Sequence, residues 1–365
     1  MANDPTKVDA LYAQGSAAFH AGRYGEACAL AALALALEPD LAALHFLLGS
    51  AQLELRDFSA SDTAFAACLA LRPKHPMVLY AQARGAVARA RRGLMSGRGP
   101  QRLAPDPNDG RRVSVVICSI DPGKFEAVCA NYRALLAGVP HEIISVHDAK
   151  SLCEGYNRGI RRASGDVIVL SHDDVVIVNP DFAARLLAHL SEYDLIGVAG
   201  TTRLIGGNWI DAGWPHLHGQ IGSSIHQPGK LVVTAFQVRG ATVPGAQALD
   251  GAFLALRREV FERVQFDERT FDGWHLYDLD FVFSAHLAGL RIAVCNDLCL
   301  MHNSIGAYHD RWEHYVQRFV QKHGARLAKG ERPPPGEAFW LEMTSFQEWL
   351  LVTEEMIARP VVDPA

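Results

Sequence analysis

The sequence predicts an all-helical N-terminal domain followed by an α/β domain with a Rossmann-like, mostly parallel sheet. In the first quarter of the chain, glycine and proline positions recur at a spacing of thirty-four residues, which is typical of a helical repeat. From Val113 onward, short β-branched runs alternate with helical stretches, the pattern of an open α/β sheet. A segment rich in Gly, Pro and Arg separates the two patterns, so the 365 residues are expected to hold two domains.

Composition indicates a folded chain without a membrane span. Hydrophobic residues make up 49% and charged residues 21%, which is enough apolar surface for sizeable cores. The longest apolar stretch, Ala27 to Leu37, is shorter than the roughly 20 residues that a bilayer-spanning helix needs. The N-terminal residues lack the apolar core of a signal peptide, so a cytoplasmic protein is expected. Seven cysteines without a C-x-x-C pair argue against disulfides and zinc, and the net charge of -5 argues against nucleic acid as a partner.

The N-terminal repeat rests on two anchor positions in one register, which are the pairs Gly15 and Gly49, and Pro39 and Pro73. Residues 8–92 resemble tetratricopeptide repeats, with a partial third unit at 77–92; they depart from that family at Ser61 and in lacking the early tryptophan. A generic alanine-rich helical array is the alternative. The resemblance implies a domain over residues 1–92 whose concave groove binds a peptide or another subunit.

Residues 93–111 lack periodicity and are expected to form a linker. Between Arg84 and Arg112 there are eight arginines against only Asp106 and Asp109. This charge could attract nucleic acid or anionic lipid. A solvated linker is the favoured interpretation, because runs of charge are usually solvated.

Apolar runs in the second domain are expected to form strands, and they span residues 113–120, 142–146, 166–170, 195–199 and 291–295. Helices are expected at about 125–136 and 151–164. Ligands of open α/β sheets bind at the carboxyl ends of the strands, so the residues after each run are informative. Asp121 follows the first run, Asp148 the second, and Ser171–Asp174 the third.

Acids and a histidine follow the later runs. Burying both Asp173 and Asp174 is costly unless a cation compensates, and a divalent cation that holds a diphosphate is the natural partner; an ordinary polar turn is the alternative. Asp278 and Asp280 lie at the start of an amphipathic helix, where they either cap the helix or keep an ionised carboxylate ready to accept a proton. His302 follows another apolar run and is a candidate third metal ligand.

Taken in order, residues 112–310 resemble the nucleotide-sugar-dependent glycosyltransferases of the GT-A fold. The closest likeness is to the family 2-type branch and its subgroup similar to a streptomycin-biosynthesis glycosyltransferase. The motifs that carry it are VSVVICSI, the helix around Asn157, GDVIVLSHDDV, LDGAFLALRREVF and YDLDF. The resemblance implies a catalytic domain over 112–326. The chain departs from the family at Ser171, where the first acid of D-x-D is expected, and at Tyr277, where a glutamate is expected before the base.

The resemblance implies a role for each candidate residue. The catalytic base would be Asp278, which deprotonates the acceptor in a single inverting displacement. Mn²⁺ or Mg²⁺ would be held by Asp173, Asp174 and His302, and the shares of the two aspartates stay open. The substrate contacts would be Ser119, Ile120, Asp121, Asp148, Asn157 and His172 for the donor, and Asp250, Gly251, Trp274, His275 and Asp280 for the sugar and acceptor.

These roles predict a metal-dependent inverting glycosyltransferase of the hexosyltransferase type, with UDP-sugars as favoured donors. The repeats would recruit a protein, peptide or glycan acceptor, or join copies of the chain into a homo-oligomer. The alternative is a scaffold whose α/β domain binds a nucleotide without turnover. A sugar-phosphate nucleotidyltransferase and a dinucleotide-dependent enzyme are disfavoured, because the first strand is followed by a single glycine and no G-x-G-x-x-G.

Two regions have open roles. Residues 206–245, with Trp209, Trp214, His216, His218 and His226, form either a mobile acceptor loop or a surface insertion, and the His-x-His pair is a weak metal signal. Residues 327–365 are expected to form a helical extension. Within it, residues 339–358 are expected to form one amphipathic helix that packs on the catalytic domain; membrane binding is disfavoured because the polar face is acidic.

Overall fold

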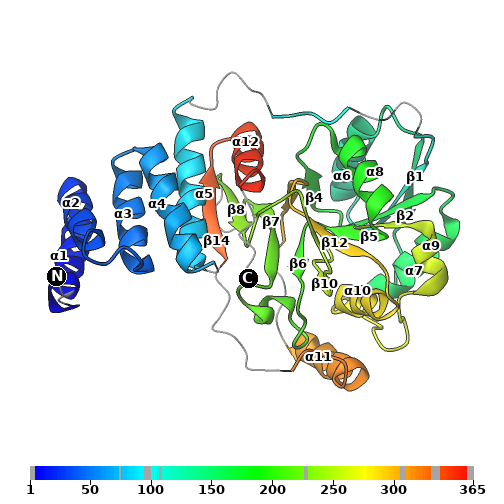
Figure 1. Cartoon of the computed structure of the whole chain (residues 1–365). Coiled ribbons are helices and arrows are strands. Elements are labelled where there is room, and N and C mark those ends of the chain that lie inside the picture. Colours follow the sequence, from blue (N-terminus) through cyan, green and yellow to red (C-terminus); the bar gives the residue numbers. More distant parts are fainter. Residues whose placement is uncertain are drawn as a thin grey trace. The chain divides into compact units, whose positions relative to one another are not determined.

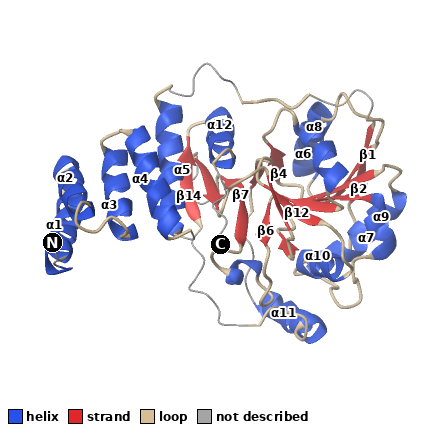
Figure 2. Cartoon of the chain, viewed as in Figure 1, coloured by secondary structure: helices blue, strands red, loops and turns tan. Residues whose placement is uncertain are grey.

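The computed structural model describes residues 5–73, 75–93, 100–104, 106, 109–225, 229–304, 310–329 and 338–359. The chain divides into two compact units, one of residues 1–96 with 360–365 and one of residues 97–359 (Figure 1). Among these described residues, strands occur in the second unit alone and the first unit is helical (Figure 2). His226 lies outside the described residues, as do parts of the expected linker and of the expected C-terminal extension. In the described part of the chain, each helix is too short or too polar to cross a membrane.

The first unit consists of α1 (Pro5–His20), α2 (Tyr24–Leu35), α3 (Ala42–Glu54), α4 (Phe58–Leu71) and α5 (Pro76–Arg91), and successive helices pack against one another. Small residues allow this close approach, because a Cβ added to Gly49 would lie only 2.8 Å from the ring of Phe65. Ser61 is buried on α4 and donates a hydrogen bond to the carbonyl oxygen of Gly49 at 2.8 Å. Its hydroxyl is therefore satisfied inside the α3–α4 contact. The expected helical N-terminal region is confirmed.

The central sheet of the second unit has the order β2-β1-β3-β11-β5-β12-β9. Its strands are β1 (Val113–Cys118), β2 (His141–Val146), β3 (Val167–Ser171), β5 (Leu195–Gly197), β9 (Thr242–Pro244), β11 (Phe253–Arg257) and β12 (Ile292–Cys295). The sheet is mixed: five of its seven strands run in one direction, as expected, whereas β9 runs antiparallel to β12 and β11 runs antiparallel to both β3 and β5. The reason is the entry point of β11: Phe253 lies opposite Ser171, the last residue of β3, so β11 starts at the carboxyl edge and must run back.

Helices cover both faces of this sheet (Figure 1), so its inner strands are buried on both sides, whereas the edge strands β2 and β9 are only partly buried. The helices are α6 (Pro122–Leu135), α7 (Leu152–Arg162), α8 (Phe182–Glu192), the short α9 (Arg258–Arg263) and α10 (Tyr277–Leu287). Val115 and Val169 join the core shared with α6 and α8, whereas their neighbours Val116 and Ile168 join the core shared with α7 and α10. Successive strand residues thus enter opposite cores, as the two-residue period of a strand requires.

A second sheet has the order β10-β6-β7-β13-β4, and β8 and β14 extend it beyond β7. Its strands are β4 (Val175–Ile177), β6 (Ala199–Thr201), β7 (Leu217–Ser223), β8 (Leu231–Ala235), β10 (Ala248–Leu249), β13 (Leu300–His302) and β14 (Phe339–Met343). The region 206–245 therefore contains the short helix η1 (Trp209–Ala212) and three strands, β7, β8 and β9, that belong to the two sheets. Two further helices are α11 (Asp310–His323) and α12 (Phe346–Ile357).

The expected single helix over 339–358 is wrong in its first part, which is β14. Phe339, Leu341 and Met343 are buried while Trp340 and Glu342 are exposed, so this stretch has the period of a strand. The expected packing of the helical part on the α/β domain is confirmed. The indole Nε1 of a fully buried tryptophan on α12, Trp349, donates to Gln220 Oε1 on β7 at 2.9 Å.

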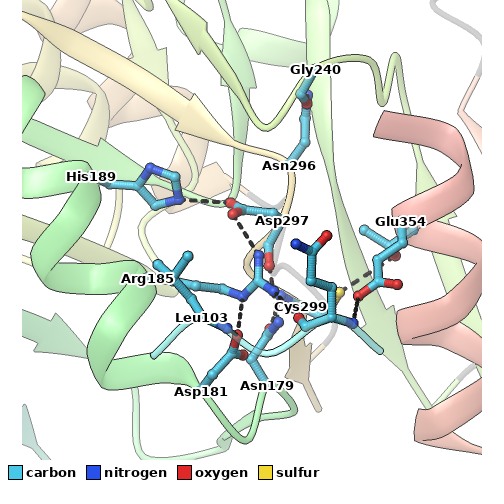
Figure 3. Close-up of polar contacts among 12 residues, drawn as sticks. Leu103, Asn179, Asp181, Arg185, His189, Gly240, Asn296, Asp297, Cys299 and Glu354 are labelled. Atoms are coloured by element: carbon cyan, nitrogen blue, oxygen red, sulfur yellow. Dashed lines mark hydrogen bonds and ion pairs between the residues drawn. The ribbon is translucent and has the colours of Figure 1, made fainter. Parts of the chain in front are cut away.

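A polar network secures the chain on its way into β13 (Figure 3). Arg185 on α8 contacts Asp181 at 2.9 Å and Asp297 at 2.8 Å, and donates to the carbonyl oxygen of Gln101 at 2.8 Å. His189 Nε2 lies 2.8 Å from the second oxygen of Asp297. Because Asp297 lies in the connection between β12 and β13, the network fixes the strand that carries His302.

Candidate active site

Segments from distant parts of the sequence meet at the carboxyl end of β3. The chain leaves β3 as His172, whose backbone N–H donates to the carbonyl oxygen of Ala252 at 3.0 Å. It continues into β4, which pairs with β13 so that Val175 lies opposite His302. These pairings place Asp174 beside His302 and bring the turn before β11 against the end of β3.

His172, Asp174 and His302 form a cluster whose candidate ligand atoms all lie within 4.8 Å of one another. His302 Nε2 is 3.2 Å from His172 Nδ1 and 3.3 Å from Asp174 Oδ1. Asp174 Oδ1 is buried, and among the described residues it has no hydrogen-bond partner apart from this contact. Two imidazole nitrogens and a carboxylate oxygen are a common donor set for divalent metal ions. The donor set and the unsatisfied oxygen therefore fit a divalent cation.

Burial and neighbouring charges set the protonation of this cluster. Burial, and then the neighbouring His302, lower the pKa of His172 to about 4. Burial opposes ionisation of Asp174, but the hydrogen bond and charge of His302 outweigh it and its pKa is lowered. For His302 itself, the hydrogen bond to Asp174 and nearby acids outweigh burial, so its pKa is raised. At neutral pH Asp174 is ionised and His172 is neutral, as metal ligands must be, whereas His302 with its raised pKa has to give up the proton it holds when a cation binds.

The adjacent acid, Asp173, has a different partner. Its Oδ2 accepts a hydrogen bond from Ser119 Oγ at 2.6 Å, which ties it to the end of β1. The two acids are thus separated: Asp174 belongs to the cluster and Asp173 to the β1 edge. His172, expected on the donor side, lies in the cluster instead.

A cavity with about 660 Å³ of empty space, including its open mouth, lies beside the cluster. Its lining includes His172, His302 and the candidate base Asp278. The expected residues Asp250, Gly251, Trp274 and His275 also line it. Sequence reasoning missed Asn208 and Trp312; the latter lies on α11, beyond the stretch with recognisable motifs.

Asp278 is held at the cavity by the start of α10. Leu276, which precedes this helix, has a left-handed φ of 57°, a strained conformation for leucine of the kind that clusters at functional sites. Burial, and then the charge of Asp250, raise the pKa of Asp278 to about 7, against backbone hydrogen bonds that include one from Gly251. Gly251 packs so closely that an added Cβ would lie 2.7 Å from Asp278 Oδ2 and would clash with Tyr277 Oη. A carboxylate with a pKa near 7 is suited to accept a proton at neutral pH.

Asp280, expected on the acceptor side, is instead buried beneath α11 and is not among the described residues that line the cavity. Its Oδ1 lies 2.7 Å from His323 Nε2 and 2.8 Å from Lys322 Nζ. Lys322 also contacts Asp267 at 2.7 Å. Asp280 therefore holds α11 against α10.

The residues expected to bind the donor lie in two different places, and most of them lie at the ends of β1 and β2. Ile120 is 84% exposed, and Asp148 is exposed and paired at 2.9 Å with Arg158, whose hydrogen bond and charge lower the pKa of Asp148. Asp121 Oδ1 caps α6 by accepting from the N–H groups of Gly123 and Lys124. Ile120, Asp121 and Asp148 thus form an accessible edge at the ends of β1 and β2, and Ser119 lies buried behind it.

Asn157 does not belong to that edge. It is buried on α7, donates to the carbonyl oxygen of Phe266 at 2.9 Å and accepts from the N–H of the same residue at 3.1 Å. The structure thus places Asn157 as an anchor for the segment that leads to α10.

The α/β part of the chain is similar to known proteins. A family model described as glycosyltransferase like family matches residues 114–323. No curated protein matches the chain. One similar solved structure is the mannosyltransferase PcManGT from Pyrobaculum calidifontis in complex with GDP-Man and Mn²⁺, at 15% identity, 77% coverage of this chain, 79% of that chain and a TM-score of 0.40.

Two further solved structures are less similar. GalNAc-T7 with UDP, GalNAc and Mn²⁺ has 11% identity, coverage of 60% of this chain and 49% of that chain, and a TM-score of 0.37. S. aureus TarS 1-349 has 13% identity, coverage of 59% and 72%, and a TM-score of 0.31. The family match, in contrast, spans more than half of this chain and includes the cluster, the cavity and Asp278. By that match, the chain belongs to the glycosyltransferase-like family.

Proposed function

We propose that the chain is a metal-dependent, inverting glycosyltransferase that moves a hexose from a nucleotide sugar, in the first instance a UDP-sugar, to an acceptor hydroxyl. The observation that carries this proposal is the pairing of a candidate cation site with a candidate base. His172 and His302 line the same cavity as Asp278, whose pKa is raised to about 7. A cation site alone would serve binding, and a base alone would serve many reactions; together they suit glycosyl transfer.

The proposed metal ligands are His172, Asp174 and His302, with Mn²⁺ or Mg²⁺ as the ion. When bound, this ion supplies Lewis-acid stabilisation of the leaving diphosphate. Asp173 would act from the β1 edge, where it orders Ser119. The nucleoside would occupy that edge, among Ile120, Asp121 and Asp148, because ligands of such sheets bind beyond the carboxyl ends of the strands.

Asp278 would act as the base. It takes the proton of the acceptor hydroxyl while the acceptor oxygen bonds to the anomeric carbon, and the bond from that carbon to the diphosphate oxygen breaks with its electron pair. Attack on the face opposite the leaving group inverts the anomeric centre. Asp250, Gly251, Trp274 and His275 would contact the sugar and acceptor, since all four line the cavity. Asn157 and Asp280 would support the site from outside it.

The helical unit is proposed to consist of tetratricopeptide repeats that recruit a protein, peptide or glycan partner, or another copy of the chain. The packing of successive helices and the close contact at Gly49 support the proposal of tetratricopeptide repeats. The likeness to a streptomycin-biosynthesis subgroup is part of the same proposal. A cytoplasmic location is also proposed, because all seven cysteines are free thiols, as is usual in reducing compartments.

Calorimetry with UDP, GDP, CDP and dTDP, each with and without Mn²⁺, tests the proposal. We expect one nucleotide to bind in a metal-dependent way, and an Asp174→Asn/His302→Ala double variant to lose this binding while staying folded. His286→Ala is a matched control, because this histidine lies at the far end of α10 from Asp278 and outside the cavity lining. If the folded wild type bound none of the four nucleotides, the chain would be better explained as a scaffold.

A further inference from the structure

The hydrogen bonds around Tyr277 determine where the proton of His172 lies. Tyr277 Oη is 2.9 Å from the carbonyl oxygen of Gly251 and 2.7 Å from His172 Nε2. A carbonyl oxygen only accepts, so the single hydroxyl proton of Tyr277 points to Gly251. The hydroxyl oxygen can then only accept from the imidazole, and His172 Nε2 must carry a proton.

This assignment leaves His172 Nδ1 with a lone pair. A neutral imidazole carries one N–H, so a proton on Nε2 makes Nδ1 an acceptor. Nδ1 faces His302 Nε2 at 3.2 Å, in the cluster that also contains Asp174. The opposite tautomer would set the Nε2 lone pair against the Tyr277 oxygen with no proton between them.

Tyr277 is itself held rigidly. Its ring is buried and packs against Tyr156 and Phe266 at centroid distances of 5.8 and 6.4 Å. Its acceptor, Gly251, lies so close that an added Cβ would clash with the hydroxyl. The tyrosine therefore cannot swing away from His172 without disturbing the start of α10.

We propose that Tyr277 is a positioning residue, which fixes the tautomer of His172 and so presents the Nδ1 lone pair to the cation. The inference rests on the proposed function, because the lone pair matters only if a cation binds there. It assigns a task to the residue at which this chain departs from the expected glutamate. Partners of this kind behind a metal-ligating histidine typically change metal affinity by about 10- to 100-fold when they are removed.

The test compares Tyr277→Phe with Tyr156→Phe in the full-length protein. Tyr156 is a matched control, since it is fully buried in the same aromatic cluster, and among the described residues its hydroxyl has no hydrogen-bond partner. Long-range ¹H–¹⁵N correlation spectra of the metal-free protein at neutral pH identify the tautomer, with His172→Gln to assign the signals. Calorimetry with Mn²⁺ then measures the affinity.

We expect wild-type His172 to be protonated at Nε2, and Tyr277→Phe to populate both tautomers and raise the Kd for Mn²⁺ by about 10- to 100-fold. Tyr156→Phe should match the wild type in both measurements. A wild-type proton on Nδ1 would overturn the inference without any variant, and so would an unchanged Mn²⁺ affinity in Tyr277→Phe. Failure of the wild type to bind Mn²⁺ would instead overturn the proposed function and this inference with it.

Discussion

Asp278→Asn should stabilise the fold while removing the proposed base. The cavity holds this carboxyl in a site where burial and Asp250 disfavour its charge, which is why its pKa rises from 3.8 to about 7. An asparagine of the same shape carries no charge to be disfavoured. Replacement of a group under such strain is expected to increase stability at the expense of activity.

The magnitude follows from the two pKa values. A difference of about three in pKa corresponds to about 4 kcal/mol, and solvent at the open mouth of the cavity reduces this to about 2–4 kcal/mol. The folded protein holds the Asp278 proton more tightly than the unfolded chain. Below about pH 4 both states are protonated and the charge costs nothing. The destabilisation grows between about pH 4 and pH 7 and is complete above pH 7, so the gain from Asp278→Asn must grow over the same interval.

Denaturant unfolding followed by tryptophan fluorescence measures this effect in the full-length chain. All six tryptophans lie between Trp209 and Trp349, so the signal reports on the α/β unit alone. The matched control is Asp280→Asn in the same helical turn. It removes the buried partner of Lys322 and His323 and should lower the free energy of unfolding by about 3 kcal/mol.

At pH 8, Asp278→Asn is thus expected to raise the free energy of unfolding and Asp280→Asn to lower it. Equal destabilisation by Asp278→Asn and Asp280→Asn would refute the reasoning, because Asp278 would then be a structural acid. A gain from Asp278→Asn that was as large at pH 4 as at pH 8 would also refute it, since the charge would not be its source.

Three further outcomes are expected. The release of nucleoside diphosphate from the donor should rise about tenfold between pH 6 and pH 8 as Asp278 loses its proton, and a flat profile would argue against a base with this pKa. Gly251→Ala should weaken Mn²⁺ binding in calorimetry, because the new methyl group displaces the hydroxyl of Tyr277; unchanged affinity would contradict the contact. Asn157→Ala should cost about 1–3 kcal/mol of unfolding free energy with UDP affinity unchanged, because it leaves the backbone of Phe266 unpaired; weaker UDP binding at unchanged stability would restore a donor role.

The strands were predictable because both faces of the sheet are buried. The β-branched runs that form β1, β3 and β12 reflect burial on both faces, that of β2 reflects partial burial at the sheet edge, and together they locate these strands to within two residues. Burial does not encode direction, so the antiparallel course of β11 was not predictable from its residues. The strand β14 is not predictable from its residues, although they alternate between buried and exposed, because only two residues separate it from α12 and its apolar positions also fit an extension of that helix.

Part of the site was predictable from one rule, which is that ligands of open α/β sheets bind at the carboxyl ends of the strands. That rule identified His172, Asp174 and His302, which the structure brings together. It could not separate Asp173 from Asp174, because both lie in the turn between β3 and β4 and only the pairing of β4 with β13 places Asp174 beside His302. Likewise, Asp278 and Asp280 share one helical turn, and their different surroundings depend on α11, some forty residues further along the chain.

The most direct test of the central claim separates binding from turnover at Asp278. Wild type and Asp278→Asn would be compared, with Mn²⁺ present, for nucleoside diphosphate binding by calorimetry and for diphosphate release from the matching nucleotide sugar. We predict that the variant binds the diphosphate with wild-type affinity and releases none above the uncatalysed rate. Undiminished release by the variant would contradict the assignment of Asp278 as the base, and loss of binding together with release would show that Asp278 maintains the site itself.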